Sequence, residues 1–220
     1  AAAGHSIVNV KTVTVRDSFF ENAPVMIRDA CQVYLLNVKC VRCGISVQKT
    51  TDLRTREIRI LGGSATNIPF GVRYGLESGV NIADVSDIVV VGFIASNNTG
   101  YGIVLKSVTN STIIGCIIER NGSAWRYGAG MHLRNTTDTL IYGNRIPNDS
   151  AVQKYSLRID QPHRRLLIQG NNFQGTGFMC YSNDTTGVVF GYNCRQESDK
   201  SAPSRPKSSL YQERLDALTH

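Results

Sequence analysis

Residues Thr139–Ile146 read TLIYGNRI and residues Leu166–Phe173 read LLIQGNNF, so one pattern occurs twice within a short stretch. In each copy an alternating apolar segment leads to a glycine, and another apolar residue stands three places after it. A polar loop and a second short apolar segment follow, at Ser156–Ile159 and at Gly177–Cys180. The pattern indicates one coil of a repeat, with a strand, a turn and a second strand.

The pattern extends over most of the chain when the chain is aligned on the turn residue. The turn residues are Asp17, Asn37, Gly62, Gly92, Gly115, Gly143, Gly170 and Gly191. A β-branched residue or Leu stands two places before each, and an apolar residue stands three places after each. The second strands are expected at Val25–Ile27, Ile45–Val47, Val72–Tyr74, Ile103–Leu105, Met131–Leu133, Leu157–Ile159 and Phe178–Cys180. The middle residue of each triplet faces outward, because side chains alternate along a strand.

The turn residues are 20 to 30 residues apart. A leucine-rich repeat keeps a tighter period, and a propeller blade needs about 40 residues. The irregular period therefore favours an all-β fold, a parallel β-helix (solenoid) of about eight coils, over the alternative of an ordinary β-sandwich. We expect a lead-in cut from a longer chain over residues 1–12, the β-helix over 13–194, and a polar tail with a linker and a short C-terminal helix or cap over 195–220.

The composition excludes some classes and favours an anionic partner. The formal net charge is +7 over 220 residues, which suits an acidic polysaccharide, a nucleic acid or a lipid surface. No apolar run reaches the roughly 18 residues of a membrane span. The basic residues lack the interleaved aromatic residues of a single-strand groove, so a nucleic acid is the weakest of these partners.

Six cysteines are present, and two of them form a single CxxC motif at Cys40 and Cys43. A zinc site needs a second such pair or a histidine pair, and neither occurs at ligand spacing. The repeat places Cys40, Cys180 and Cys194 in the core, where we expect buried free thiols. We expect no metal and no cofactor.

The outward positions of the second strands bring chemistry-bearing residues together. Equivalent residues of neighbouring coils lie about 4.8 Å apart. On this spacing His132, Arg134, Arg158 and Asp160 form a two-by-two square, which we take as the candidate catalytic group. The candidate substrate-binding residues, from the neighbouring coils and from one loop, are Arg73, Lys106, Trp125, Tyr127 and Tyr181.

This square suits an anionic sugar chain. Arg158 or Arg134 could neutralise the carboxylate of a uronic acid while His132 or Tyr181 removes its C5 proton. Hydrolysis would need two carboxyl groups about 5 to 9.5 Å apart. Asp160 is one candidate, and Glu119 and Asp149 lie in neighbouring loop regions, but the repeat places neither of them within this distance of Asp160. The simpler interpretation is a solvated face on which Arg134 and Asp160 pair across coils.

The strand Val-x-Ile-x-Gly-Asn-x-Phe and the following Gly-Ile-x-Leu strand resemble the right-handed parallel β-helix of the pectin lyase-like superfamily. That superfamily includes pectate lyases, polygalacturonases, alginate epimerases and bacteriophage tailspikes. The resemblance covers about residues 13–194 and implies the fold more than the activity. Tyr101-Gly102-Ile103 resembles the start of an epimerase motif, but Val104-Leu105-Lys106 replaces its Asp-Pro-His-Asp. Of the polygalacturonase motifs only Arg158-Ile159-Asp160 has a counterpart, and no carboxylate cluster of the calcium-dependent pectate lyase kind is present.

Six Asn-x-Ser/Thr triplets have a second interpretation besides glycosylation. They begin at Asn97, Asn110, Asn121, Asn135, Asn148 and Asn183. Asn tolerates the left-handed backbone conformation that the corners of a coil require, so we expect these residues to be corner residues.

The sequence leads to one main hypothesis and two alternatives. The main one is a tailspike-type β-helix that binds, and in the enzymatic variant degrades, a bacterial surface polysaccharide, acidic in kind. It implies a homo-oligomer, a trimer if a tailspike, located in a virion tail or outside the cell. The first alternative is a secreted polysaccharide lyase or related carbohydrate-active enzyme, and the second is a structural or adhesive β-solenoid without catalysis. Whether the protein is an enzyme stays open, with a polysaccharide depolymerase (lyase or glycoside hydrolase) favoured.

Overall fold

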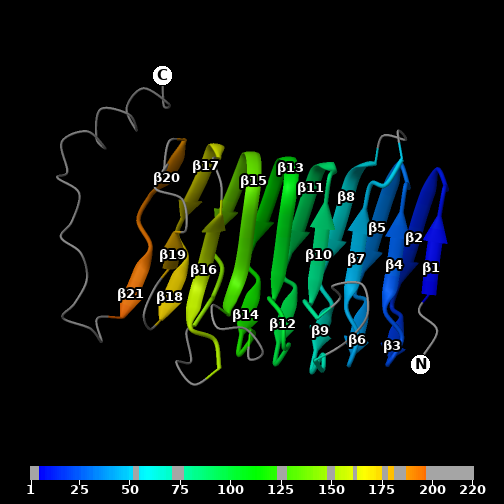
Figure 1. Ribbon diagram of the computed structural model, residues 1–220, viewed down its shortest axis with the longest axis horizontal. Helices are drawn as coiled ribbons and strands as arrows, with labels where there is room; N and C mark the ends of the chain where they lie inside the picture. The colour runs from blue at the N-terminus through cyan, green and yellow to red at the C-terminus, as the bar shows by residue number, and fades with distance from the viewer. Residues whose placement is uncertain are drawn as a thin grey trace.

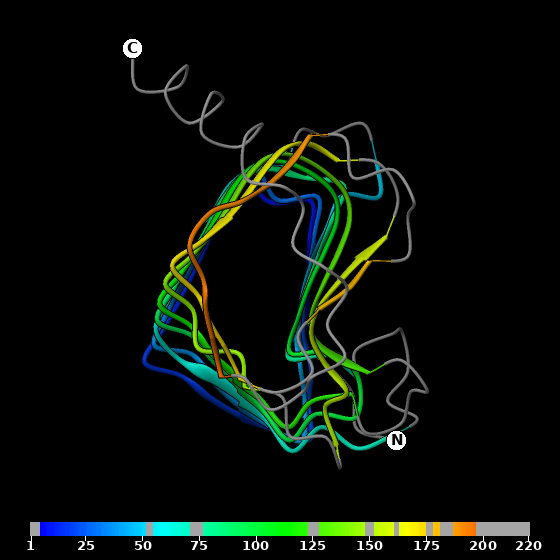
Figure 2. The same ribbon diagram turned by 90° about the vertical axis from the view of Figure 1, so that its left-hand side faces the viewer.

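The computed structural model describes residues 5–51, 55–70, 77–122, 128–147, 152–160, 163–174, 178–180 and 187–196. All regular elements of this part of the chain are β-strands, and all their pairings are parallel. The strands lie side by side along one long axis in the order of the sequence (Figure 1). The view along that axis shows the coils superimposed in one closed outline (Figure 2). The predicted β-helix of about eight coils is therefore confirmed.

Each coil has three faces, which we number in chain order. Face 1 holds the strands before the turn residue: β2 (Thr12–Arg16), β5 (Gln32–Leu36), β8 (Arg56–Leu61), β11 (Ser86–Val91), β17 (Arg164–Gln169) and β20 (Val188–Phe190). Face 2 holds short strands: β3 (Phe19–Glu21), β6 (Lys39–Val41), β9 (Ser64–Thr66), β12 (Ile94–Ser96), β14 (Ile117–Glu119), β18 (Asn172–Gln174) and β21 (Cys194–Gln196).

Face 3 holds the second strands of the coils: β1 (His5–Val8), β4 (Val25–Arg28), β7 (Ile45–Gln48), β10 (Val80–Ala83), β16 (Tyr155–Asp160) and β19 (Phe178–Cys180). Two long strands, β13 (Ile103–Ile114) and β15 (Ala129–Tyr142), cross the corner from face 3 of one coil into face 1 of the next. Strand β1 pairs in parallel with β4 and so extends face 3 by one strand.

The second strand of the third coil was predicted at Val72–Tyr74, and this prediction was wrong. Strand β10 takes that place, because Asn81 pairs with Ser46 of β7 and with Val104 of β13. Gly79 suits this place: a Cβ atom there would lie 2.7 Å from the carbonyl oxygen of Gly102, so the tight stacking before β10 requires glycine. Arg73 lies outside the described residues, and Asn81 occupies the outward position predicted for it.

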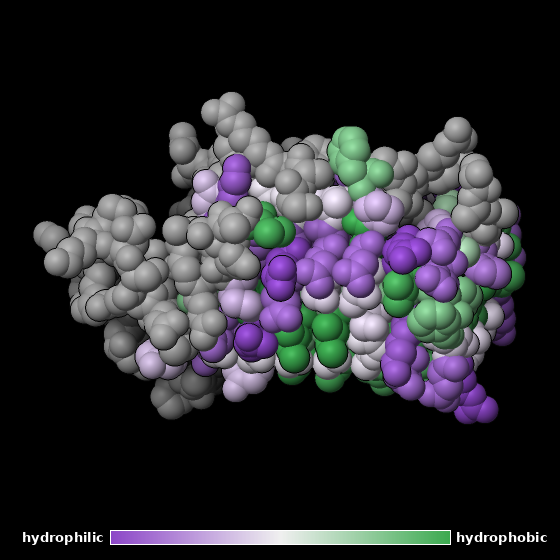
Figure 3. Space-filling view, turned by 90° about the horizontal axis from the view of Figure 1, so that it is seen from below, coloured by the Kyte–Doolittle hydropathy of each residue, from purple (hydrophilic) through white to green (hydrophobic). Residues whose placement is uncertain are grey.

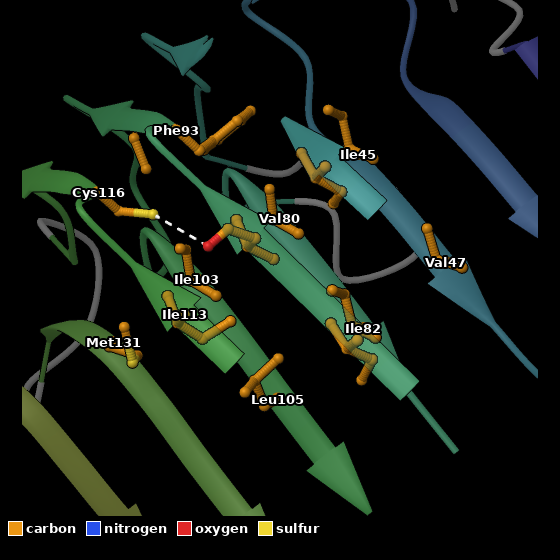
Figure 4. Close-up of a cluster of buried hydrophobic side chains, with 14 of the residues drawn as sticks. Ile45, Val47, Val80, Ile82, Phe93, Ile103, Leu105, Ile113, Cys116 and Met131 are labelled. Carbon is orange, nitrogen blue, oxygen red and sulfur yellow. Dashed lines mark hydrogen bonds between the residues drawn. The ribbon is translucent and has the colours of Figure 1, made fainter. Parts of the chain in front are cut away.

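The interior is apolar and close-packed. Ile and Val side chains from faces 1 and 3 fill it together with Phe93 and Cys116 (Figure 4), and these residues are almost completely buried. The prediction of a buried free thiol is confirmed for Cys40, which is fully buried. The side chains of Cys180 and Cys194 lie outside the described residues. Seen from the side of face 2, the described surface mixes polar and apolar side chains (Figure 3), and Phe19 and Ile94 are exposed there.

The corners of the coils use the left-handed backbone conformation. The turn residues Asn37 and Gly143 have φ of 51° and 62°. Asn97, Asn110 and Asn135 have φ between 52° and 56°, so the prediction of corner residues is confirmed for them. Asn121 differs, because its side chain is fully buried. Asn148 and Asn183 lie outside the described residues.

Asparagine side chains also form hydrogen-bonded ladders after the turn residues. The Asn144 side-chain amide donates to the carbonyl of Ile113 and to Asn171 Oδ1, at 3.0 and 2.9 Å. Asn144 Oδ1 accepts the backbone N–H of Cys116 at 2.9 Å. Asn171 continues the ladder to Asn193. Each rung satisfies backbone groups that the turn leaves unpaired inside the coil.

A buried carboxylate holds the end of β7 in place. Asp29 is 1% exposed and accepts the backbone N–H groups of Thr50 and Thr51 and the Thr50 hydroxyl, at 2.6 to 2.9 Å. Burial by itself raises the pKa of Asp29, but these hydrogen bonds outweigh burial and lower the pKa to about 2. The ionised form is therefore the one that the fold stabilises.

Replacing Asp29 with Asn is expected to lower the free energy of unfolding at neutral pH by about 2–3 kcal/mol, because charged hydrogen bonds become neutral ones. The pKa of Asp29 is lower in the folded state than its unfolded value of about 3.9. The stabilisation is thus present above pH 3.9 and is lost as the pH falls toward 2. Chemical unfolding of both proteins between pH 2 and 7 checks this. A difference that persists unchanged at pH 2 would contradict it.

Candidate functional site

The outward residues of face 3 lie in register across four strands. Asn81, Val104, His132 and Arg158 form one row across β10, β13, β15 and β16. Two residues further along the strands, the second row contains Lys106, Arg134 and Asp160. The predicted two-by-two square is present, because parallel coils in register place equivalent residues side by side.

Asp160 is the centre of the interactions within this square. Its Oδ2 atom lies 2.8 Å from His132 Nε2 on the neighbouring coil. Arg158, two residues before it, donates from Nε to Oδ1 at 3.0 Å, and its Nη2 atom lies 2.8 Å from Oδ2. The three side chains are only 14 to 20% exposed. Asp160 therefore has partners on both of its carboxylate oxygens.

The simpler interpretation, in which Arg134 and Asp160 pair directly across coils, does not describe this arrangement. Asp160 binds the diagonal neighbour His132 and Arg158 of its own strand instead. Arg134 and Lys106 are exposed, and neither has an ion-pair partner among the described residues. Two neighbouring cations thus remain available beside the His132–Asp160 pair.

Burial and hydrogen bonding shift the pKa of each member of the group. Burial lowers the pKa of His132 below 6.5, although the hydrogen bond with Asp160 acts in the other direction. Burial raises the pKa of Asp160, but hydrogen bonds from Arg158 and His132 outweigh it, so the pKa is lowered. At neutral pH the histidine is accordingly neutral, and the carboxylate is ionised.

Tyr101 completes the group from the loop before β13. Its hydroxyl oxygen accepts a hydrogen bond from Arg158 Nη1 at 2.8 Å. Its ring centroid lies 4.7 Å from that of His132, with the ring planes tilted by 41°. The Tyr101 backbone N–H donates to the Ser78 hydroxyl, which fixes the loop. Burial raises the pKa of Tyr101, so the phenol keeps its proton at neutral pH.

Tyr101 and His132 line a pocket of about 180 Å³ on face 3. The other lining residues are Glu77, Ser78, Asn81, Gly100 and Val104. Glu77 is the acidic residue among them, and its backbone carbonyl oxygen accepts the Gly100 N–H at 2.9 Å. Glu119, considered above as a second carboxylate, lies on face 2 and pairs with Arg145 at 3.3 Å. It is therefore not part of the site, and Asp149 lies outside the described residues.

Sequence reasoning missed Tyr101 and Glu77 as site residues. The available clue to Tyr101 was its place at the end of the polar segment Ser96–Tyr101, directly before the strand Ile103–Leu105. Glu77 was missed because the second strand of the third coil was placed too early in the chain. Trp125, Tyr127 and Tyr181 lie outside the described residues, as does Arg73.

A larger hollow of about 370 Å³ lies on face 1, near Glu57 and Asp87. Its carboxylates already have partners: Glu57 accepts from Tyr34 and Gln32, and Asp87 accepts from Asn110 and Ser86. These hydrogen bonds lower the pKa of Glu57, so no proton-transfer pair is present there. The smaller pocket on face 3 is the better candidate for chemistry.

The described residues contain no group of three or more His, Cys, Asp or Glu side chains arranged to hold a metal ion. The same part of the chain contains no helix long and apolar enough to cross a membrane.

Comparisons with known proteins agree with the fold. The family model of the right handed beta helix region matches residues 71–200. The A-module of the mannuronan C-5 epimerase AlgE4 of Azotobacter vinelandii has a similar structure, with a TM-score of 0.58 and 16% sequence identity. The match covers 84% of this chain and 54% of that structure, so the chain spans about half its length. No curated protein matches the sequence. The right-handed parallel β-helix implied by the sequence resemblance is confirmed.

Proposed function

The chain belongs to the right-handed β-helix family, and on this scaffold we propose that the face 3 pocket binds an acidic polysaccharide and removes the C5 proton of a uronic acid. The observation that carries the proposal is the hydrogen bond between His132 Nε2 and Asp160 Oδ2 beside the Tyr101 ring. The pairing gives the pocket a histidine held by a carboxylate, which is a recurring arrangement for a general base.

His132 has the role of the base. Asp160 is ionised and can only accept a hydrogen bond, so neutral His132 donates its Nε2 proton to it. This assigns the tautomer and leaves the Nδ1 lone pair to take a proton from the substrate. Because Arg158 also holds Asp160, the carboxylate and the ring are fixed before substrate binds.

Arg134 and Lys106 have the role of binding the uronate carboxylate. They are exposed neighbours on adjacent coils, and a cation beside a carboxylate stabilises the negative charge that develops when the C5 proton leaves. Arg158 is less suited to this role, since Asp160 and Tyr101 occupy its guanidinium group.

Tyr101 has the role of the acid. Arg158 donates to its oxygen, so the phenolic proton is free to leave toward substrate. Proton transfer to the O4 leaving group would complete an elimination, with cleavage of the C4–O4 bond. Proton return to C5 from the opposite face would complete an epimerisation without chain cleavage. The name of the AlgE4 module, a C-5 epimerase of mannuronan, which is a polyuronic acid, supports chemistry at this carbon.

Hydrolysis suits the pocket less well. It needs a protonated carboxyl group as general acid, and Asp160 is held ionised by two partners. This proposal thus takes the carbohydrate-active enzyme alternative rather than the tailspike interpretation. The tailspike assembly, its trimeric state and a location in a virion tail or outside the cell stay predictions.

The test is incubation with polymannuronate, polyguluronate, polygalacturonate and hyaluronan, with three readouts. Ultraviolet absorbance of the unsaturated product together with new reducing ends is expected for elimination. A changed uronate composition without new ends is expected for epimerisation. New reducing ends without absorbance would mean hydrolysis and would contradict the proposal.

The pH dependence of turnover follows from the two shifted pKa values. Activity requires neutral His132, whose pKa lies below 6.5, so the acidic limb of the profile is expected below pH 6.5. Activity also requires protonated Tyr101, whose raised pKa places the alkaline limb above pH 10. A pH profile of kcat/KM of wild type and of Tyr101→Phe checks both. Tyr101→Phe is expected to reduce the rate and to remove the alkaline limb.

A further inference from the structure

Two thiols meet inside the second coil, far along the helix from the Asp160 group. Cys40 lies on β6 and points into the core, and Cys43 follows the corner at which Arg42 has φ of 55°. Both side chains are fully buried, both are free thiols, and they are hydrogen-bonded to each other. The Cys43 sulfur also lies 3.4 Å from the carbonyl oxygen of Phe20.

The two thiols are not equivalent. The hydrogen bond from Cys40, helped by the backbone N–H groups of Ala23 and Val41, lowers the pKa of Cys43 to about 7 against the opposing effect of burial. The same hydrogen bond and burial raise the pKa of Cys40. Cys116 serves for comparison with Cys43. It is equally buried, but burial raises its pKa to about 11. Cys43 is thus the thiol of the pair that loses its proton first.

We propose that Cys40 and Cys43 form a peroxide-sensitive dithiol that closes to an intramolecular disulfide. The geometry supports it, because both free thiols are buried in the core of the same coil, on either side of one corner, and only two residues separate them. The oxidant must be small, since neither thiol reaches the surface. Hydrogen peroxide meets this requirement, whereas a bulky disulfide such as oxidised glutathione does not.

The chemistry balances with peroxide alone. The Cys43 thiolate attacks one peroxide oxygen, the O–O bond breaks, and a sulfenic acid and hydroxide form. The Cys40 sulfur then attacks the Cys43 sulfur, the S–O bond breaks, and the hydroxyl group leaves as water. In sum, two thiols lose two protons and two electrons, and one peroxide becomes two waters.

The bridge would join the end of β6 to the approach of β7. The ring encloses only Val41 and Arg42, so it constrains the unfolded chain little and adds little to global stability. Its effect is local: β7 pairs with β10, and Asn81 of β10 lines the face 3 pocket. Oxidation at the second coil therefore acts on a strand next to that pocket.

Trypsin provides a direct test, because it cleaves after Lys39, Arg42 and Lys49 and so separates the two cysteines. The folded full-length protein is treated with hydrogen peroxide, its remaining thiols are alkylated in denaturant, and the digest is analysed by mass spectrometry. Peptide 40–42 is expected to be linked to peptide 43–49, at a mass two hydrogens below their sum. The link should disappear after reduction with dithiothreitol.

Variants assign the order of events. In Cys40→Ser, a sulfenic acid at Cys43 is expected to persist and to be trapped by dimedone when the oxidised protein is unfolded in denaturant. In Cys43→Ser, Cys40 is expected to remain a thiol. Cys116→Ser is the control and should leave the linked peptide unchanged. The proposal is overturned if wild type gives no linked peptide at a peroxide concentration that oxidises the partly exposed Cys31, or if Cys40 links to another cysteine. The test needs no polysaccharide, so it is independent of the proposed function.

Discussion

Replacing His132 with Gln is expected to reduce turnover of an acidic polysaccharide by about 10²–10⁴-fold, the usual contribution of a general base. Gln can still donate a hydrogen bond to Asp160, so the carboxylate keeps a partner and the coil keeps its register. It has no nitrogen that can take the C5 proton. The loss is expected in kcat more than in KM, because Arg134 and Lys106 still bind the substrate carboxylate.

A matched control separates chemistry from folding. His5→Gln changes an exposed histidine on β1, several coils from the pocket, and is expected to leave turnover unchanged. Circular dichroism and the denaturation midpoint of His132→Gln should resemble those of wild type. An active His132→Gln protein would show that His132 is not the base.

Replacing Asn144 with Ala is expected to lower the free energy of unfolding by about 2–6 kcal/mol. The side chain fills one step of the interior ladder and satisfies Cys116 N–H, Ile113 C=O and Asn171 Oδ1. Its removal leaves the Cys116 N–H and the Ile113 C=O without this partner, at about 1–3 kcal/mol for each, whereas Asn171 Oδ1 still accepts the backbone N–H of residue 144. Asn144 is 1% exposed, so water does not readily replace the lost amide.

Asn172→Ala is the control for the ladder. Asn172 follows Asn171 directly, but its side chain is partly exposed and lies outside the ladder, so a change of about 0.5 kcal/mol or less is expected. Urea denaturation of the three proteins gives the comparison. Equal destabilisation by both substitutions would show that the interior ladder adds no stability of its own.

The fold was predictable because each coil repeats the same physical requirement. A turn residue such as Gly143 must adopt a positive φ, and the residues around it must alternate between core and surface. The alternation recurs in eight coils, and seven of the eight turn residues have a positive φ, so the pattern can be recognised in a single sequence. The third coil was the exception: Val72–Tyr74 and Val80–Ile82 both satisfy the alternation and both follow a glycine, so the sequence pattern alone does not distinguish them.

The site was predictable only where strand register defines it. The rows containing His132 and Arg158 follow from counting along paired strands. The register did not predict whether Asp160 binds Arg134 or His132, because the length and direction of the side chains decide this. Tyr101 did not follow either. It meets Arg158 from 57 positions earlier in the chain, through a loop whose path no periodicity determines.

The most direct test of the central claim uses polyuronates labelled with tritium at C5. Elimination and epimerisation both release this label to water, so the measurement does not depend on which product forms. The account predicts tritium release by wild type from at least one polyuronate and a loss of release in His132→Gln. No release from mannuronan, guluronan or polygalacturonate by the folded protein would contradict it and would favour a structural or adhesive β-solenoid. Undiminished release by His132→Gln would place the base elsewhere.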